Sequence, residues 1–261
     1  DMYVELHAAS AFSFLDGASL PEALIEQAHT LGYDAIALLD RDGVYGAPRF
    51  YQAAKKAGLR ALVGAELTMQ TGTPARDVRT APLHPPLIWR LPVLVESASG
   101  YRSLCRLITR MKMAAAKGQG ALTLHDLDGH VEGLVAIAGR PMLAADRHGV
   151  AGLLDQIVGV FGRTQVYVEV QRHLTRDEEA DNRILMSAAA AYRVPVMATN
   201  GVRFATPDAR PLYDVLTCIR HGTTLEHAGR RLAANAERYL KSPKQMQALF
   251  SDLPEALANT R

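Results

Sequence analysis

Cysteine is scarce in this sequence, whose 261 residues include only two, Cys105 and Cys218. The two lie far apart, each within an apolar helical pattern, and neither belongs to a CxxC pair. This spacing argues against a disulfide framework and against a cysteine-based zinc site. We interpret both as core thiols of a protein in a reducing compartment, and we expect a cytoplasmic location.

Long apolar segments are also missing, since no run of 18 apolar residues occurs, and we therefore expect no membrane partner. The sequence does not open with the basic and then apolar pattern of a secretory signal. Lysine supplies only six of the 29 basic residues, and the formal net charge is +2. This near balance gives no general sign of nucleic-acid binding. Arginine pairs such as Arg76 with Arg79 or Arg230 with Arg231 leave direct contact with DNA open.

What the sequence does contain is a regular alternation of short apolar segments with connections of helical length. The expected strands cover residues 3–6, 35–40, 60–67, 91–96, 134–138, 166–170 and 195–199. Such alternation favours parallel pairing with right-handed crossovers. We predict an α/β fold, a β/α barrel of about seven parallel strands rather than an open sheet, over residues 1–222. A Pro-rich insertion at 70–90, either a surface loop or a hairpin, interrupts it, and residues 223–261 form a helical tail.

The strands predict where the core lies. Four strand residues are expected to be fully buried: Leu38, Val63, Val168 and Val196.

Polar side chains gather at the ends of these strands. They are His7, Asp16, Asp40, Glu66, His173 and Asn200. A barrel brings strand ends to one rim, and imidazoles mixed with carboxylates suit zinc or manganese, whose bound water could attack a phosphoester. The alternative is that these groups cap helices and face solvent. Ala9, Arg41 and Arg203 stand where further ligands would be needed, and arginine does not ligate metals.

Several stretches resemble one known family. They include YVELHAASAFSFLDGAS, AIALLDRDGVYGAPRFYQAAKKAGLRALVGAEL, VYVEVQRH, PVMATNGVRF and AERYLKSPKQMQALF. They are similar to the N-terminal PHP (polymerase and histidinol phosphatase) domain of bacterial C-family DNA polymerases, and the resemblance covers essentially the whole chain. DVLTCIRHGTTLEHAGRRL resembles the error-prone branch of the DNA polymerase III alpha subunit.

The resemblance implies a barrel that holds up to three metal ions in active members. Four positions match family ligands: His7, Asp16, Glu66 and His173. Five others depart from the ligand pattern: Ala9, Arg41, Arg140, Gly201 and Arg203. Because these five positions depart from the pattern, we expect no cofactor in this chain. Binding of a residual zinc or manganese ion by the four matching residues is the alternative.

Two functions follow from the resemblance. The first is a catalytically inactive PHP domain that supports an error-prone, translesion DNA-directed DNA polymerase, whose nucleotidyl transfer belongs to other domains. Its partners would be the polymerase domains of the same chain and a replication or repair protein. The second is a metal-dependent phosphoesterase or exonuclease on the reduced site.

The lost ligands also lead to a structural prediction. We expect Arg41, Arg203 or both to reach toward Asp16 or Glu66. A guanidinium there would replace the charge that a metal supplies, and it would relieve repulsion between carboxylates.

Overall fold

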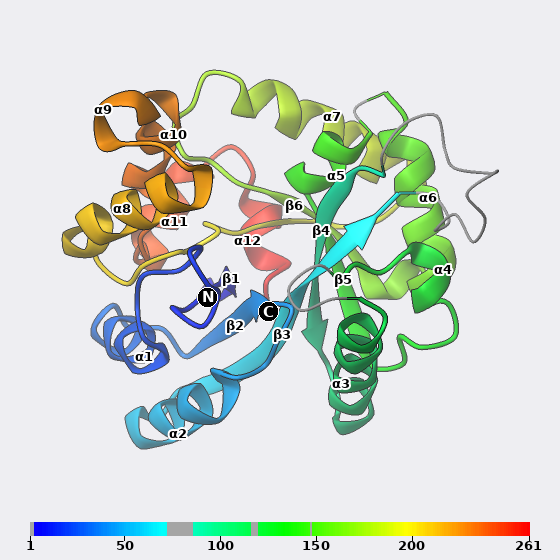
Figure 1. Ribbon diagram of the computed structural model, residues 1–261, viewed down its shortest axis with the longest axis horizontal. Helices are drawn as coiled ribbons and strands as arrows, with labels where there is room; N and C mark the ends of the chain where they lie inside the picture. Colours follow the sequence, from blue (N-terminus) through cyan, green and yellow to red (C-terminus); the bar gives the residue numbers. More distant parts are fainter. Residues whose placement is uncertain (1–2, 72–85, 116–119, 147) are drawn as a thin grey trace.

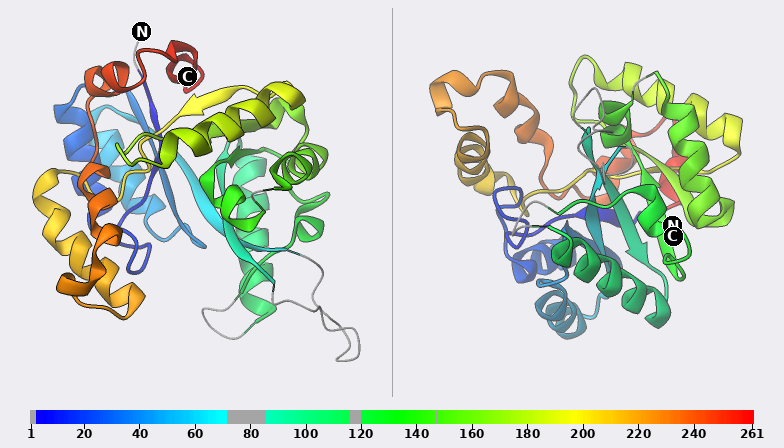
Figure 2. Two further views of the ribbon diagram at one scale, coloured as in Figure 1. Left: turned by 90° about the horizontal axis from the view of Figure 1, so that it is seen from above. Right: turned by 45° about the vertical axis from the view of Figure 1, so that its right-hand side comes forward.

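The computed structural model describes residues 3–71, 86–115, 120–146 and 148–261, and it is built around one seven-stranded sheet. The sheet follows the order of the sequence: β1 (Glu5–Ala8), β2 (Ala35–Arg41), β3 (Arg60–Gln70), β4 (Ile88–Val95), β5 (Leu134–Ala138), β6 (Val166–Val170) and β7 (Val196–Ala198). The sheet curls, with helices outside it (Figures 1 and 2). The predicted α/β, barrel-like architecture is confirmed in this half-barrel form.

The direction of β4 corrects the prediction of uniformly parallel strands. Strand β4 pairs antiparallel with β3 and with β5, whereas the remaining neighbours pair parallel. The cause lies in the Pro-rich stretch, which lacks the helical pattern of the other connections. Strands β3 and β4 form a hairpin whose register begins at Gln70 opposite Ile88. Part of the predicted insertion at 70–90 thus belongs to strands, and residues 72–85 lie outside the described residues.

Helices cover the outer side of the curled sheet. Between the strands they are α1 (Pro21–Thr30), α2 (Ala47–Ala57), α3 (Ala98–Met113), α4 (Leu124–Leu127), α5 (Arg140–Ala145), α6 (Val150–Phe161) and α7 (Glu178–Tyr192). After β7 follow α8 (Arg210–His221), α9 (Leu225–Ala228), α10 (Arg230–Ala233), α11 (Pro243–Leu249) and α12 (Pro254–Ala258). Among the described helices none is long and apolar enough to cross a bilayer.

The predicted tail, residues 223–261, packs on the barrel core. Leu240, Met246 and Phe250 belong to the same buried cluster as Ile36 of β2. The Val4 N–H donates to Thr260 Oγ1 at 3.1 Å, which ties the last helical segment to the start of the first strand. The division into barrel and tail therefore remains a sequence prediction, because one core spans both parts.

Alternation along the strands sorts side chains between two apolar layers. In β6, Val166 and Val168 join the cluster under the outer helices, whereas Tyr167 packs with a small cluster that also holds Leu39. The residue after Val168 is Glu169, which alternation turns toward the inner side with Tyr167. A glutamate within an otherwise apolar strand is thus directed to the concave face of the sheet.

Burial of the four predicted core residues differs by position. Leu38 is 2% exposed and Val168 is fully buried. Val63 and Val196 are only partly buried, although both pack against the core. The prediction of full burial is therefore confirmed for Leu38 and Val168 and wrong for Val63 and Val196.

Truncation of Leu38 to Ala should lower the free energy of unfolding by about 2–5 kcal/mol, because a cavity would replace a buried side chain. Urea unfolding of the purified chain measures it. Val63→Ala is the matched control, since it shortens a half-buried side chain on the neighbouring strand. Equal losses in the two variants would contradict this account of the core.

Candidate functional site

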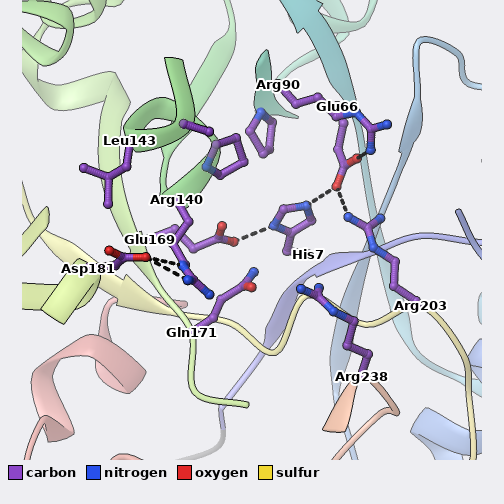
Figure 3. A pocket seen from close by; sticks show the side chains of 13 residues that line it. His7, Glu66, Arg90, Arg140, Leu143, Glu169, Gln171, Asp181, Arg203 and Arg238 are labelled. Carbon is purple, nitrogen blue, oxygen red and sulfur yellow. Dashed lines mark hydrogen bonds and ion pairs between the residues drawn. The ribbon is translucent and has the colours of Figure 1, made fainter. Parts of the chain in front are cut away.

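The candidate site lies where the parallel strands end. His7 comes from β1, Glu66 from β3 and Glu169 from β6, while Arg203 follows β7. These side chains line a pocket of about 570 Å³ and point toward one another (Figure 3). Asp40 ends the buried part of β2, and Asn200 follows β7. The prediction that polar residues from different strands share one rim is therefore confirmed.

His7 is held between two glutamates. Its Nδ1 lies 2.5 Å from Glu169 Oε2, and its Nε2 lies 2.5 Å from Glu66 Oε1. Carboxylates accept hydrogen bonds, so both ring nitrogens carry protons and donate. Burial lowers the pKa of His7, but the charges of Glu169 and Glu66 outweigh it and raise the pKa to about 10. An imidazolium has no lone pair to offer a metal ion.

Glu66 faces three cations at once. Besides His7, it accepts a hydrogen bond from Arg203 Nη2 at 2.7 Å, and Arg90 Nη1 lies 3.4 Å from its other oxygen. Burial raises the pKa of Glu66, yet the charge of Arg203 and the bond to His7 hold it well below its usual value. Glu66 is 1% exposed and remains ionised because cations surround it.

Asp16 lies between two further arginines. Arg90 Nη1 donates to its Oδ2 at 2.5 Å, and Arg220 of α8 donates to its Oδ1. Burial raises the pKa of Asp16, but Arg203, Arg90 and Arg220 together lower it. The carboxylate that the family pattern assigns to a metal is here neutralised by guanidinium groups.

These contacts form one ion-pair network. Its members are His7, Asp16, Glu66, Arg90, Glu169, Arg203 and Arg220. Four cations thus face three carboxylates, which leaves the network at a net charge of +1. Each carboxylate of the network already faces at least one cation, so none of the three is left unpaired to attract a divalent ion. In the described part of the chain, no group of three His, Cys, Asp or Glu side chains could hold a metal ion.

His173, the fourth residue of the predicted metal set, belongs to a separate cluster. Its Nδ1 lies 2.8 Å from Glu178 Oε1 and its Nε2 lies 2.7 Å from the Asn200 carbonyl oxygen. Both ring nitrogens are occupied, and the residue ties the start of α7 to the segment after β7. Burial lowers the pKa of His173, and Arg238 lowers it further. The structure therefore brings His7, Asp16 and Glu66 together and keeps His173 apart.

Asp40 also has a local role. Ser10 donates to it through N–H and hydroxyl at 2.7 and 2.9 Å, and the Ser13 hydroxyl donates at 2.8 Å. Burial raises the pKa of Asp40 despite these hydrogen bonds. Its carboxylate fixes the loop after β1, the loop that carries Asp16.

The positions that depart from the ligand pattern are distributed differently. Arg203 makes the predicted contact with Glu66, whereas Arg41 donates to the Phe14 carbonyl at 3.1 Å and takes no part in the network. Ala9 is fully buried. Arg140 lines the pocket and pairs with Asp181 at 2.7 Å.

Gly201 has a backbone that disfavours a restored ligand. Its φ is +55°, and an added Cβ would lie 2.6 Å from the Gln171 amide nitrogen. L-residues rarely adopt this conformation. An aspartate, the residue that the family resemblance implies at this position, would therefore be strained here.

The sequence prediction missed three network members: Arg90, Glu169 and Arg220. Glu169 carried a signal, because it interrupts an apolar strand at an inward position. Arg90 could not be placed, since a parallel β4 would have its first residues at the opposite edge of the sheet. Arg220 comes from α8, and no local pattern relates that helix to the loop after β1.

The raised pKa of His7 predicts a dependence of stability on pH. The folded chain holds this proton until about pH 10, whereas an unfolded histidine loses it near its usual value of 6.5. The stabilisation is therefore complete below pH 6.5 and is lost as the pH rises through about 10. Urea unfolding between these limits should show a falling free energy of unfolding. His7→Gln should flatten the dependence of unfolding free energy on pH. His29→Gln, at an exposed position, should leave that dependence unchanged. Identical slopes for the two variants would contradict the assignment of the pH dependence to His7.

Comparison with known proteins agrees with this architecture. A family model described as PHP domain matches residues 5–173. An error-prone DNA polymerase of Anaeromyxobacter sp. (strain K) is 41% identical over 264 residues, covering 98% of this chain and 22% of that protein. An error-prone DNA polymerase of Brucella abortus biovar 1 (strain 9-941) is 37% identical over 263 residues, covering 99% of this chain and 23% of that protein. The chain thus spans less than a quarter of the length of these curated relatives.

Solved structures are similar in fold at low sequence identity. One, a putative metal-dependent phosphoesterase from Bifidobacterium adolescentis, aligns with a TM-score of 0.52 at 15% identity, over 76% of this chain and 86% of that one. Another, an amidohydrolase from Chromobacterium violaceum with bound SO4 and no metal, aligns with a TM-score of 0.56 at 14% identity, over 77% and 88%. These likenesses concern the fold alone. Because the family model matches residues 5–173, well over half of the sequence, this chain belongs to the PHP domain family.

Proposed function

We propose that this chain is a non-catalytic PHP domain that supports an error-prone DNA-directed DNA polymerase. The observation that carries the proposal is the ion-pair network, in which Arg203 and Arg90 neutralise Glu66 and Asp16. A hydrolytic metal centre needs open coordination positions and deprotonated ligands. Here the imidazole is protonated and the carboxylates are paired, so the domain contributes structure rather than hydrolysis.

The relatives support the polymerase context. Their names are those of error-prone DNA polymerases, and each is more than four times as long as the matching part. Nucleotidyl transfer would therefore belong to domains outside this chain, and the PHP domain would pack against them. The polymerase as a whole would carry out translesion synthesis in the cytoplasm. A replication or repair protein is a further candidate partner of the same assembly.

The alternative is a metal-dependent phosphoesterase or exonuclease that uses His7, Asp16, Glu66 and His173. Only the similarity of the fold to that of a putative metal-dependent phosphoesterase favours it. Assays of the purified chain with phosphomonoester and DNA substrates, with zinc or manganese added, separate the two functions. We expect no turnover above that of a His7→Ala variant. Turnover that depends on metal and on Glu66 would overturn the proposal.

The supporting role needs a test in the longer polymerase. Leu38→Ala, placed in such a polymerase, should reduce its primer extension and its yield of soluble protein together, because the core of the supporting domain is weakened. Val63→Ala should reduce both less. Full polymerase activity of a variant whose PHP domain has unfolded would contradict the role.

A further inference from the structure

Helix α8 uses only one of its two apolar sides within the chain. On the inner side, Tyr213, Thr217 and Cys218 are buried, and the Tyr213 ring packs against Phe204 with ring centroids 5.4 Å apart. The helix lies at the outer edge of the molecule, beside α9 and α10 (Figures 1 and 2). Packing inside the chain therefore accounts for the inner side of α8 alone.

The outer side of α8 carries a row of aliphatic side chains. Leu212 is 53% exposed, Val215 is 42% exposed and Ile219 is 59% exposed. Their spacing of three and then four residues places them on one face of the helix. A surface helix usually turns polar and charged residues toward solvent. This aliphatic row has no such polar character, and the described part of the chain leaves it exposed.

Other helices of the chain do not share this pattern. Helix α2 exposes Tyr51 next to Gln52 and Lys55, and α3 exposes Tyr101 next to Arg102. Single exposed apolar residues are ordinary on a protein surface, whereas a contiguous apolar patch indicates a contact surface. The aliphatic row on α8 therefore indicates a contact surface.

Positive charge lies at one end of the aliphatic row. Arg230 and Arg231 of α10 are exposed, and Glu226 is the only exposed acidic residue among the described residues of α8, α9 and α10. Burial and the charges of Arg220 and Arg231 lower the pKa of His221, the last residue of α8, so Arg231 lies near that end of the helix. A partner with an acidic group at this end would be complementary in charge.

We propose that the aliphatic row of Leu212, Val215 and Ile219 docks an apolar face of the polymerase portion that lies outside these 261 residues, with an acidic group of that portion near Arg231. The inference rests on the proposed function and names the surface through which the domain would support the polymerase. The curated relatives provide such a portion, because each is more than four times as long as its match to this chain.

The size of the aliphatic row favours a partner in the same polypeptide. Separate proteins that form a stable complex contact each other through about 20–30 residues a side, far more than this row supplies. A partner joined by the peptide chain is held at a high effective concentration, so a small apolar contact is sufficient. A second copy of the chain would lack this advantage.

Cysteine labelling with a maleimide tests whether the row is covered. Ile219→Cys should react readily in the 261-residue chain and at least about tenfold more slowly in the longer polymerase, because docking covers the side chain. Tyr51→Cys is the matched control, since Tyr51 is 58% exposed on α2, and it should react equally in both proteins. Mass spectrometry of the labelled peptides distinguishes these sites from Cys105 and Cys218.

Two results of the labelling would overturn the proposal. One is equal reactivity of Ile219→Cys in the two proteins. The other is slow labelling in the 261-residue chain itself, together with a dimer in size-exclusion chromatography, which would assign the row to a second copy.

A charged variant separates the docking surface from the proposed function. Ile219→Glu should leave the melting temperature of the 261-residue chain unchanged, but it should reduce primer extension by the longer polymerase at least about tenfold, because docking would bury a charge. Tyr51→Glu should change neither quantity. If Leu38→Ala impairs the polymerase and Ile219→Glu does not, the docking surface is wrong and the supporting role stands. If neither variant impairs it, the proposed function fails together with the docking surface.

Discussion

Replacing Arg203 with Met should destabilise the chain by about 3–5 kcal/mol, because it leaves Glu66 charged and without its nearest guanidinium in a buried site. Glu66 is 1% exposed, and Arg203 Nη2 donates to it at 2.7 Å. Methionine has a similar length and no charge, so the loss reports on the ion pair rather than on a cavity. Urea unfolding at neutral pH measures the effect.

Arg41→Met is the matched control for that experiment. Arg41 is a second arginine at a position where the resemblance implies a ligand, but its guanidinium donates to the Phe14 carbonyl oxygen and joins no carboxylate of the network. Removing the Arg41 guanidinium should lower the free energy of unfolding by no more than about 1 kcal/mol, as is usual for partly exposed polar contacts. A loss at Arg41 as large as that at Arg203 would show that the network is not what stabilises this rim.

Glu66→Leu should destabilise the chain by a similar amount, about 3–5 kcal/mol, since Arg203 and His7 would then be buried cations without their shared acceptor. The informative variant is the double substitution Glu66→Leu with Arg203→Met. Removing both members of the pair should cost less than the sum of the single losses, by about 1–3 kcal/mol. Additive losses in unfolding experiments would mean that the two side chains act independently.

Most of the architecture could be predicted from the sequence because hydrophobic periodicity follows strand and helix geometry. The fifth and sixth strands lie where the apolar runs 134–138 and 166–170 predict them. The direction of β4 could not be predicted, because periodicity within a strand is the same whichever way the strand runs. Direction depends on the connection, and the Pro-rich segment before β4 carries no helical pattern.

The candidate site was predictable only in part, since it is assembled from residues distant in sequence. His7, Asp16 and Glu66 follow from strand ends, and the role of Arg203 follows from charge compensation. His173 met the same criteria but contacts Glu178 and Asn200 instead, because the segment after β6 leads it toward α7. Which of several polar strand ends converge depends on loop geometry, which has no simple sequence signature.

The arginines of the ion-pair network supply the positive charge that the buried carboxylates of this rim need. Carboxylates that faced one another without cations would raise each other's pKa and weaken the fold at neutral pH. Arg90, Arg203 and Arg220 provide that charge directly. The account therefore ties stability to arginine rather than to metal supply.

Thermal unfolding of the purified chain before and after chelation, with metal content measured on the same sample, tests this claim most directly. A ligand that binds only the folded state raises its stability, by about 2.7 kcal/mol at a hundred times its Kd. The account predicts less than stoichiometric zinc or manganese, an unchanged melting temperature after chelation, and no increase when either ion is added in modest excess. Stoichiometric zinc in the purified chain, together with a lower melting temperature after its removal, would contradict the account.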